Sequence, residues 1–181
     1  MLKGFKNSTI YTGNEVIAGK SVVVREGIVE SVIDDSEIPQ GAELVDCRGN
    51  NLAPGFLDLQ IAGGGGFLFS SNPAPEALER IAEAITASGT TAFLIAIPTN
   101  SFDVYRKVIR VVKDNPHPAV LGLHIEGPYI NPLRRGAHLR EYIKLPEVNE
   151  LKELITLAGG VVKMITLAPE ICSREIINML N

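Results

Sequence analysis

The sequence has little that would mark a secreted or membrane-spanning protein. Its only two cysteines, Cys47 and Cys172, lie far apart and form no Cys-x-x-Cys pattern, so a disulfide framework is not expected. No apolar run approaches the length of a membrane-spanning helix, and residues 1–8 lack the apolar core of a signal peptide. We therefore predict a cytoplasmic protein whose thiols are buried and reduced.

The sequence also lacks a strong excess of charge of either sign. A formal net charge of -4 argues against electrostatic capture of nucleic acid or of an anionic membrane. A phosphorylated small molecule is still compatible, because a few cations and backbone N–H groups can hold one locally. With 181 residues, 45% of them hydrophobic, the chain can bury the core of one domain or of two small ones.

Short β-rich runs separated by turn residues fill the sequence from residue 9 to residue 52. The clearest pattern is a hairpin, in which β-branched runs at 21–25 and 28–33 flank Glu26-Gly27. Glycine supplies the positive φ that such a tight turn requires. The pattern of apolar and turn residues changes near Asn51, so we predict one unit over residues 1–51 and a second over residues 52–181.

The second predicted unit alternates apolar runs with segments of helical period, which is typical of β/α units around a parallel sheet. Strands are expected at 55–61, 91–97, 119–125 and 161–167, and helices at 76–88, 101–115, 146–158 and from 173 onward. The inward side chains of the second expected helix are Val104, Val108, Val111 and Val112, and those of the third include Leu151, Leu154 and Ile155. A (β/α)₈ barrel has eight strands and typically ~250 residues. Four units therefore predict half of a barrel, with an open four-stranded α/β sheet as the alternative.

Functional groups of such folds gather at the carboxyl ends of the strands. His124 and Glu126 end the third expected strand, and their spacing of two places both side chains on the same side of it. Burying a carboxylate there is costly unless it is paired or binds a cation, so Glu126 is a candidate metal ligand. The alternative is that Glu126 caps the following loop and that His124 is a core histidine with both nitrogens hydrogen-bonded.

Two loops add further candidates. The loop after the third expected strand carries Arg134, Arg135 and His138. His138 could donate a hydrogen bond to a substrate oxygen, and the arginines could attract an anion. The alternative is that the loop is a solvated surface segment. The glycine run 63–66 follows the first strand and could expose backbone N–H groups to an anion or form a hinge. It does not match a dinucleotide-binding fingerprint.

Several motifs together resemble the N-acetylglucosamine-6-phosphate deacetylases of the amidohydrolase superfamily. The matching segments are Ala53-Pro54-Gly55-Phe56-Leu57-Asp58-Leu59-Gln60, the glycine run, Gly89-Thr90-Thr91, Pro98-Thr99, Leu123-His124-Ile125-Glu126-Gly127-Pro128-Tyr129-Ile130-Asn131, Arg135-Gly136-Ala137-His138 and Thr166-Leu167-Ala168-Pro169-Glu170. Their order and spacing agree with the family over nearly the whole chain. The His-x-Glu-Gly-Pro stretch followed by Gly-Ala-His is the most specific part.

The resemblance implies a small β-sandwich domain, of which residues 1–51 form part, attached to a (β/α)₈ barrel. It implies hydrolysis of the N-acetyl group of the amino-sugar phosphate. It also implies that the complete enzyme is a homodimer with one divalent cation per site, and zinc is the expected metal. Glu126 would be a metal ligand, His138 and the backbone of Ala137 would contact the sugar, and Gln60 would lie near the metal. In the family the cation polarises the amide carbonyl and activates water.

The resemblance also predicts that the chain is incomplete and inactive alone. The family's general-base aspartate and two metal-binding histidines are expected beyond Asn181. Related amidohydrolases carry His-x-His at the end of the first strand, where this chain reads Gln60-Ile61-Ala62, so a binuclear site is not expected. Two alternatives are open: a deacetylase for another acetylated amino-sugar phosphate, and a non-catalytic half-barrel that needs a partner.

Overall fold

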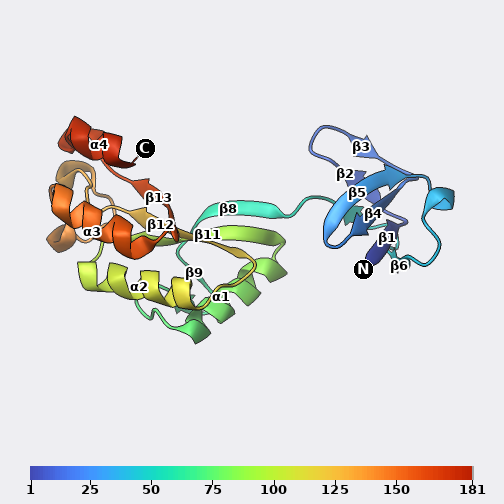
Figure 1. Ribbon diagram of the computed structural model, residues 1–181, viewed down its shortest axis with the longest axis horizontal. Helices are drawn as coiled ribbons and strands as arrows, with labels where there is room; N and C mark the ends of the chain where they lie inside the picture. The colour runs from blue at the N-terminus through green and yellow to red at the C-terminus, as the bar shows by residue number, and fades with distance from the viewer. Residues whose placement is uncertain (181) are drawn as a thin grey trace. The chain divides into compact units, whose positions relative to one another are not determined.

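The computed structural model describes residues 1–180, and the chain divides into two compact units, Met1–Pro54 and a unit that begins at Gly55. Figure 1 shows short strands in the first unit and a sheet with helices in the second. Among the described residues, no helix is both long enough and apolar enough to span a membrane.

The first unit is built from two small sheets. The larger sheet has the order β5-β4-β1-β6 and comprises β5 (Ile28–Ile33), β4 (Ser21–Arg25), β1 (Leu2–Lys6) and β6 (Glu43–Asp46). The smaller has the order β3-β2-β7 and comprises β3 (Val16–Ile17), β2 (Thr9–Tyr11) and β7 (Asn51–Leu52). A short 3-10 helix spans Asp35–Glu37. The β4–β5 hairpin is confirmed, and both of its turn residues, Glu26 and Gly27, have positive φ.

The second unit contains a four-stranded parallel sheet of order β8-β11-β12-β13. Its strands are β8 (Phe56–Ile61), β11 (Thr90–Pro98), β12 (Val120–Glu126) and β13 (Val162–Thr166), and its helices are α1 (Pro75–Ala87), α2 (Phe102–Asp114), α3 (Val148–Ala158) and α4 (Arg174–Leu180). Figure 1 shows α1, α2 and α3 along one face of the sheet. The strands follow chain order without the reversal that defines a doubly wound sheet. The predicted α/β class is confirmed.

Shorter elements fill the connections of the second unit. They are β9 (Gly63–Gly64), β10 (Phe67–Leu68) and the 3-10 helices Pro132–Arg134, Arg140–Tyr142 and Pro169–Ile171. Local sequence explains where one helix starts and where another ends. The Ser101 hydroxyl accepts a hydrogen bond from the Val104 N–H at the start of α2, and Gly159 ends α3 in the left-handed conformation.

The main core lies between the helices and the helix-facing side chains of β11 and β12. The buried strand residues are Phe93, Ile95, Ile97, Leu123 and Ile125. On α2 the prediction was partly wrong: Val108 and Val112 are buried as expected, but Tyr105 and Ile109 are the other two buried positions, and Val104 and Val111 are only partly buried. The apolar face is therefore centred on Tyr105 and Ile109 as well as on the valines.

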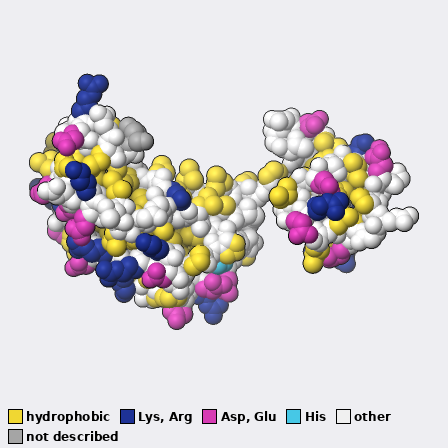
Figure 2. Space-filling model, in the orientation of Figure 1, with side chains coloured by type: hydrophobic (Ala, Val, Ile, Leu, Met, Phe, Trp, Pro, Cys, Tyr) yellow, Lys and Arg dark blue, Asp and Glu magenta, His cyan; other side chains and the backbone are white. Residues whose placement is uncertain are grey.

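Several large apolar side chains of the sheet remain exposed. They are Phe56, Leu57 and Leu59 of β8, Leu121 of β12 and Met164 of β13. Figure 2 shows hydrophobic side chains gathered along the part of the surface formed by β8. Parallel sheets are ordinarily covered on both faces, so this much exposed apolar surface is unusual for such a sheet.

Candidate functional site

The carboxyl ends of three neighbouring strands bring four polar residues together. Gln60 at the end of β8 donates from Nε2 to Glu126 Oε1 at the end of β12, with a separation of 2.6 Å. Thr99, directly after β11, donates from its hydroxyl to the backbone carbonyl of Glu126 at 3.1 Å. His138 Nδ1 lies 2.8 Å from the same hydroxyl. Gln60, Glu126 and His138, three of the residues singled out in the sequence, thus belong to one polar cluster.

His124 is part of the buried sheet. Only 2% of its surface is exposed. Its Nδ1 lies 3.0 Å from the carbonyl oxygen of Leu59, and its Nε2 lies 2.7 Å from the hydroxyl of Thr166. Since a carbonyl only accepts, Nδ1 carries the proton and Nε2 accepts from the hydroxyl. Both nitrogens are used, so the structure favours the interpretation of His124 as a core histidine.

The loop after β12 places His138 at the cluster, and Arg135 of the same loop bonds to the loop backbone. His138 is half-buried, whereas Ala137, the other predicted substrate contact, is exposed beside it. The Arg135 guanidinium donates to the carbonyl oxygens of His138 and Gly136, at 2.8 and 3.2 Å. Arg135 therefore holds its own loop together. Arg134 is exposed.

Two buried tyrosines form hydrogen bonds next to the strand ends and this loop. The Tyr105 hydroxyl accepts a hydrogen bond of 3.1 Å from the backbone N–H of Asn100, and burial raises the pKa of Tyr105 well above its ordinary value. Tyr129 donates to Glu150 Oε1 at 3.2 Å, and burial, followed by the nearby Glu150 charge, raises the pKa of Tyr129. Lys144 pairs with the other oxygen of Glu150. Both phenols are therefore protonated structural groups at neutral pH.

The glycine run after β8 forms neither an open anion nest nor a hinge. Gly63–Gly64 pairs with Phe67–Leu68 as a small antiparallel hairpin. Gly65, with φ +57, lies so close to α1 that an added Cβ would come within 2.7 Å of the Arg80 carbonyl oxygen. These glycines allow the hairpin to pack against the helix.

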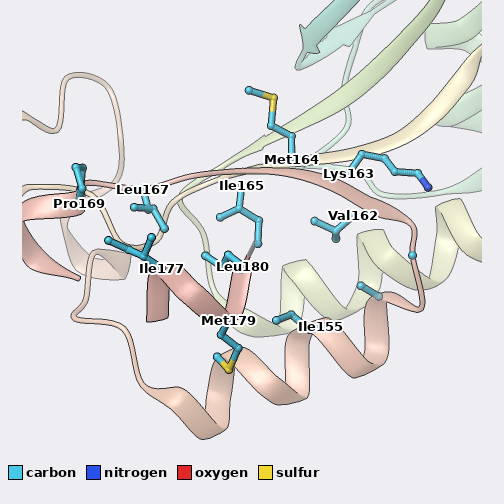
Figure 3. Close-up of a pocket in the computed structure, with 12 residues that line it drawn as sticks. Ile155, Val162, Lys163, Met164, Ile165, Leu167, Pro169, Ile177, Met179 and Leu180 are labelled. Atoms are coloured by element: carbon cyan, nitrogen blue, oxygen red, sulfur yellow. The ribbon is translucent and has the colours of Figure 1, made fainter. Parts of the chain in front are cut away.

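A cavity of about 480 Å³ lies away from the polar cluster, along the edge strand β13 and between α3 and α4. Figure 3 shows Ile155, Ile165, Met179 and Leu180 directed toward this space. Ile155 was predicted to face inward, and this was wrong: its side chain is exposed because it lines the open cavity. The lining is mostly apolar and carries one charged side chain, Lys163, so the cavity offers packing surface rather than chemistry.

The described residues do not complete a metal site. Among residues 1–180, no group of three or more His, Cys, Asp and Glu side chains is placed to hold a metal ion. Glu126 is a suitable single oxygen ligand, but both nitrogens of His124 are hydrogen-bonded, and Gln60 uses its Nε2 to donate to Glu126, which leaves only its neutral Oε1 as a further oxygen. A catalytic zinc typically needs three protein ligands. The residues present therefore fit one corner of such a site and not the whole of it.

One residue of the cluster had no role in the sequence prediction. Thr99 was noted at the end of the second strand, but its side chain and backbone both contact His138, which is 39 residues away. The strand-end rule that selected Glu126 applies equally to Thr99, so the position could be found from sequence. Its partner could not, because the loop between β12 and α3 has no periodic pattern that fixes its path.

Comparisons with known proteins point to one family. The family model described as "NagA composite domain" matches residues 5–52. N-acetylglucosamine-6-phosphate deacetylase of Haemophilus influenzae is 36% identical over 168 residues, which are 91% of this chain and 44% of that protein. The human protein of the same name is 40% identical over 144 residues, 75% of this chain and 35% of that protein.

Solved structures agree with the sequence matches. The N-acetylglucosamine-6-phosphate deacetylase of Pasteurella multocida superposes with a TM-score of 0.87 and 32% identity, covering 94% of this chain and 46% of that one. The Thermotoga maritima enzyme of the same name superposes with a TM-score of 0.77 and 28% identity over 99% of this chain. The resemblance predicted from the motifs is confirmed. The chain spans less than half the length of the curated relatives it matches.

Proposed function

We propose that this chain, which corresponds in sequence and fold to less than half of an N-acetylglucosamine-6-phosphate deacetylase, is the amino-terminal half of such an enzyme. The reaction would be hydrolysis of the N-acetyl group of N-acetylglucosamine-6-phosphate, giving glucosamine-6-phosphate and acetate. The observation that carries the proposal is the meeting of Gln60, Glu126 and His138 at the strand ends. These residues belong to the motifs that resemble the family, and they lie where α/β enzymes place their chemistry.

We assign roles to the chain's own residues. Glu126 supplies one oxygen ligand to a divalent cation, and the Gln60 amide orients that carboxylate by donating to Oε1. His138 and the backbone of Ala137 contact the sugar. When bound, the cation would polarise the amide carbonyl and activate water; its remaining ligands and the general-base aspartate would come from residues outside this chain.

The proposed architecture is the first half of a (β/α)₈ barrel preceded by part of a small β-sandwich domain. The β-sandwich part would be residues 1–51, and the barrel part would be residues 52–181. The unbroken strand order β8-β11-β12-β13 supports the barrel, because barrel strands follow chain order. The exposed apolar side chains of β8 support it too, since barrel closure would cover that edge.

The proposal is tested by acetate release from N-acetylglucosamine-6-phosphate. The chain alone should show no turnover, whereas the chain joined to the carboxyl-terminal remainder of the Haemophilus influenzae relative should be active with an added divalent cation. In the joined protein, Glu126→Gln should reduce activity by more than the roughly 10- to 100-fold that follows loss of an outer-shell partner. Glu141→Gln, which removes the same charge from an exposed position of the next loop, is the matched control.

The outcomes separate the parts of the proposal. Turnover by the chain alone would refute incompleteness, and full activity of the Glu126→Gln variant would remove the ligand role. Faster hydrolysis of the epimeric acetylated mannosamine phosphate would show that the substrate is another acetylated amino-sugar phosphate.

A second candidate function is a non-catalytic half-barrel that needs a partner. The observation that favours it is the apolar cavity beside the open edge strand β13, because unpaired edges readily bind another chain. Light scattering on the purified chain distinguishes it: this candidate predicts a defined oligomer, and a monodisperse monomer would contradict it. Homodimer formation by the complete enzyme, zinc as the metal and a cytoplasmic location stay predictions from the resemblance.

A further inference from the structure

Thr99 contacts His138 through its backbone N–H and through its hydroxyl. Its backbone N–H donates to His138 Nδ1 at 3.3 Å, and its hydroxyl oxygen lies 2.8 Å from the same nitrogen. Thr99 is 1% exposed, so water does not compete for either contact. Both of these contacts of His138 Nδ1 therefore come from one residue.

The backbone N–H decides which ring nitrogen carries the proton. An amide N–H can only donate, and it cannot rotate away from its peptide plane. A proton on His138 Nδ1 would face the Thr99 N–H proton, so Nδ1 must present its lone pair. In the neutral ring the proton then lies on Nε2.

The Thr99 hydroxyl reinforces the same arrangement. When Nδ1 presents its lone pair, both neighbours of the Thr99 hydroxyl are acceptors, so its single proton is shared between His138 Nδ1 at 2.8 Å and the Glu126 carbonyl oxygen at 3.1 Å. Gly127 makes this approach possible, because a Cβ there would lie 2.2 Å from the Thr99 hydroxyl oxygen.

We propose that Thr99 is a positioning residue that fixes the ring of His138 in the Nε2–H tautomer, so that His138 presents a hydrogen-bond donor away from the strand ends. The consequence for substrate binding rests on the proposed function: a ring held this way donates to a substrate oxygen and cannot accept from a substrate hydroxyl through Nε2. The tautomer itself is a property of the free chain.

Nitrogen NMR of the histidine rings tests the tautomer without substrate. The chain has three histidines, and spectra recorded at pH 8, well above the ordinary imidazole range, should show His138 with its proton on Nε2. His124 should show the opposite tautomer, with its proton on Nδ1, because a carbonyl faces that nitrogen. Its signals serve as an internal reference and as a marker of folding.

Two variants test the part played by the Thr99 side chain. Thr99→Val keeps the size and the backbone N–H but removes the hydroxyl, so the Nε2–H form should persist while the His138 ring signals shift and broaden because the ring loses its 2.8 Å contact. Thr99→Ser, which keeps a hydroxyl, should leave the His138 ring signals as they are in the unsubstituted chain. The His124 signals should not change in either variant, which separates loss of positioning from loss of the fold.

Two outcomes would overturn the proposal: a proton on His138 Nδ1 in the unsubstituted chain, or His138 signals unaffected by Thr99→Val while His124 reports a folded sheet. In an active joined protein, Thr99→Val should raise KM about 2- to 10-fold, as expected for one hydrogen bond, and Thr99→Ser should not. Failure of the joined protein to act on the sugar phosphate would count against the proposed function alone.

Discussion

His124 should stabilise the sheet through its two hydrogen bonds, and His124→Phe measures how much. The ring bridges β8 and β13 by contacting the Leu59 carbonyl at 3.0 Å and the Thr166 hydroxyl at 2.7 Å. Phenylalanine retains an aromatic ring in this buried position but makes neither bond. Two hydrogen bonds at about 0.5–1.5 kcal/mol each predict a loss of about 1–3 kcal/mol in the free energy of unfolding.

Urea unfolding followed by far-UV circular dichroism measures this loss of unfolding free energy for the second unit, which contains His124. The helices α1 to α4 all lie in the second unit, so the helical signal reports its unfolding. A double-mutant cycle with Thr166→Val isolates the hydrogen bond from any effect of ring size. The coupling free energy should be about 1 kcal/mol, and the two single changes should add to more than the double change.

The matched control pairs His124→Phe with Thr86→Val. The Thr86 hydroxyl bonds only to carbonyls within α1, so it shares no partner with His124, and the two changes should be additive within about 0.3–0.5 kcal/mol. A coupling near zero between His124 and Thr166 would refute the hydrogen-bonded role of this histidine. A loss below about 0.5 kcal/mol in His124→Phe would refute it as well.

Two further predictions concern the support of the site. Tyr105→Phe leaves the Asn100 N–H without its acceptor and should lower the free energy of unfolding by about 1–3 kcal/mol in the same urea assay, whereas a change below about 0.5 kcal/mol would contradict the contact. The Asn131 amide donates to Glu170 at 2.7 Å and holds the pKa of Glu170 below its ordinary value of 4.5. The stability that this contact contributes should therefore be fully present above pH 4.5 and be lost as the pH falls through the lowered pKa. NMR titration should show that pKa return toward 4.5 in Asn131→Ala, and an unchanged pKa would argue against it.

Local periodicity was sufficient to predict the four strands of the parallel sheet and the four α-helices of the second unit, but not β9, β10 or the 3-10 helices. The strand predicted over 91–97 and the helix predicted over 76–88 differ by one residue at each end from β11 and α1. An apolar run and an amphipathic repeat are properties of the segment itself, so they can be recognised without knowledge of the fold. The first unit shows the limit. Strand β1 was not predicted, although it lies between β4 and β6 in the sheet.

The reason is that β1 depends on distant partners. Its sequence, Leu-Lys-Gly-Phe-Lys, has a glycine at its centre, which lowers intrinsic strand preference. Yet Gly4 pairs with Val23 on one side and with Leu44 on the other. An added Cβ at Gly4 would lie 3.0 Å from the side chain of Ile38. The feature that weakens the local signal is thus the one that allows close packing.

The same division between local and distant information applies to the two histidines near the strand ends. The sequence placed His124 and Glu126 on one side of β12, but it could not say which groups would face each ring. Leu59 presents a carbonyl to His124 from 65 residues away, whereas Thr99 presents an amide N–H to His138 from 39 residues away. An acceptor in one case and a donor in the other fix opposite tautomers. His124 is thereby bound within the sheet, and His138 keeps a proton on the nitrogen that faces away from Thr99.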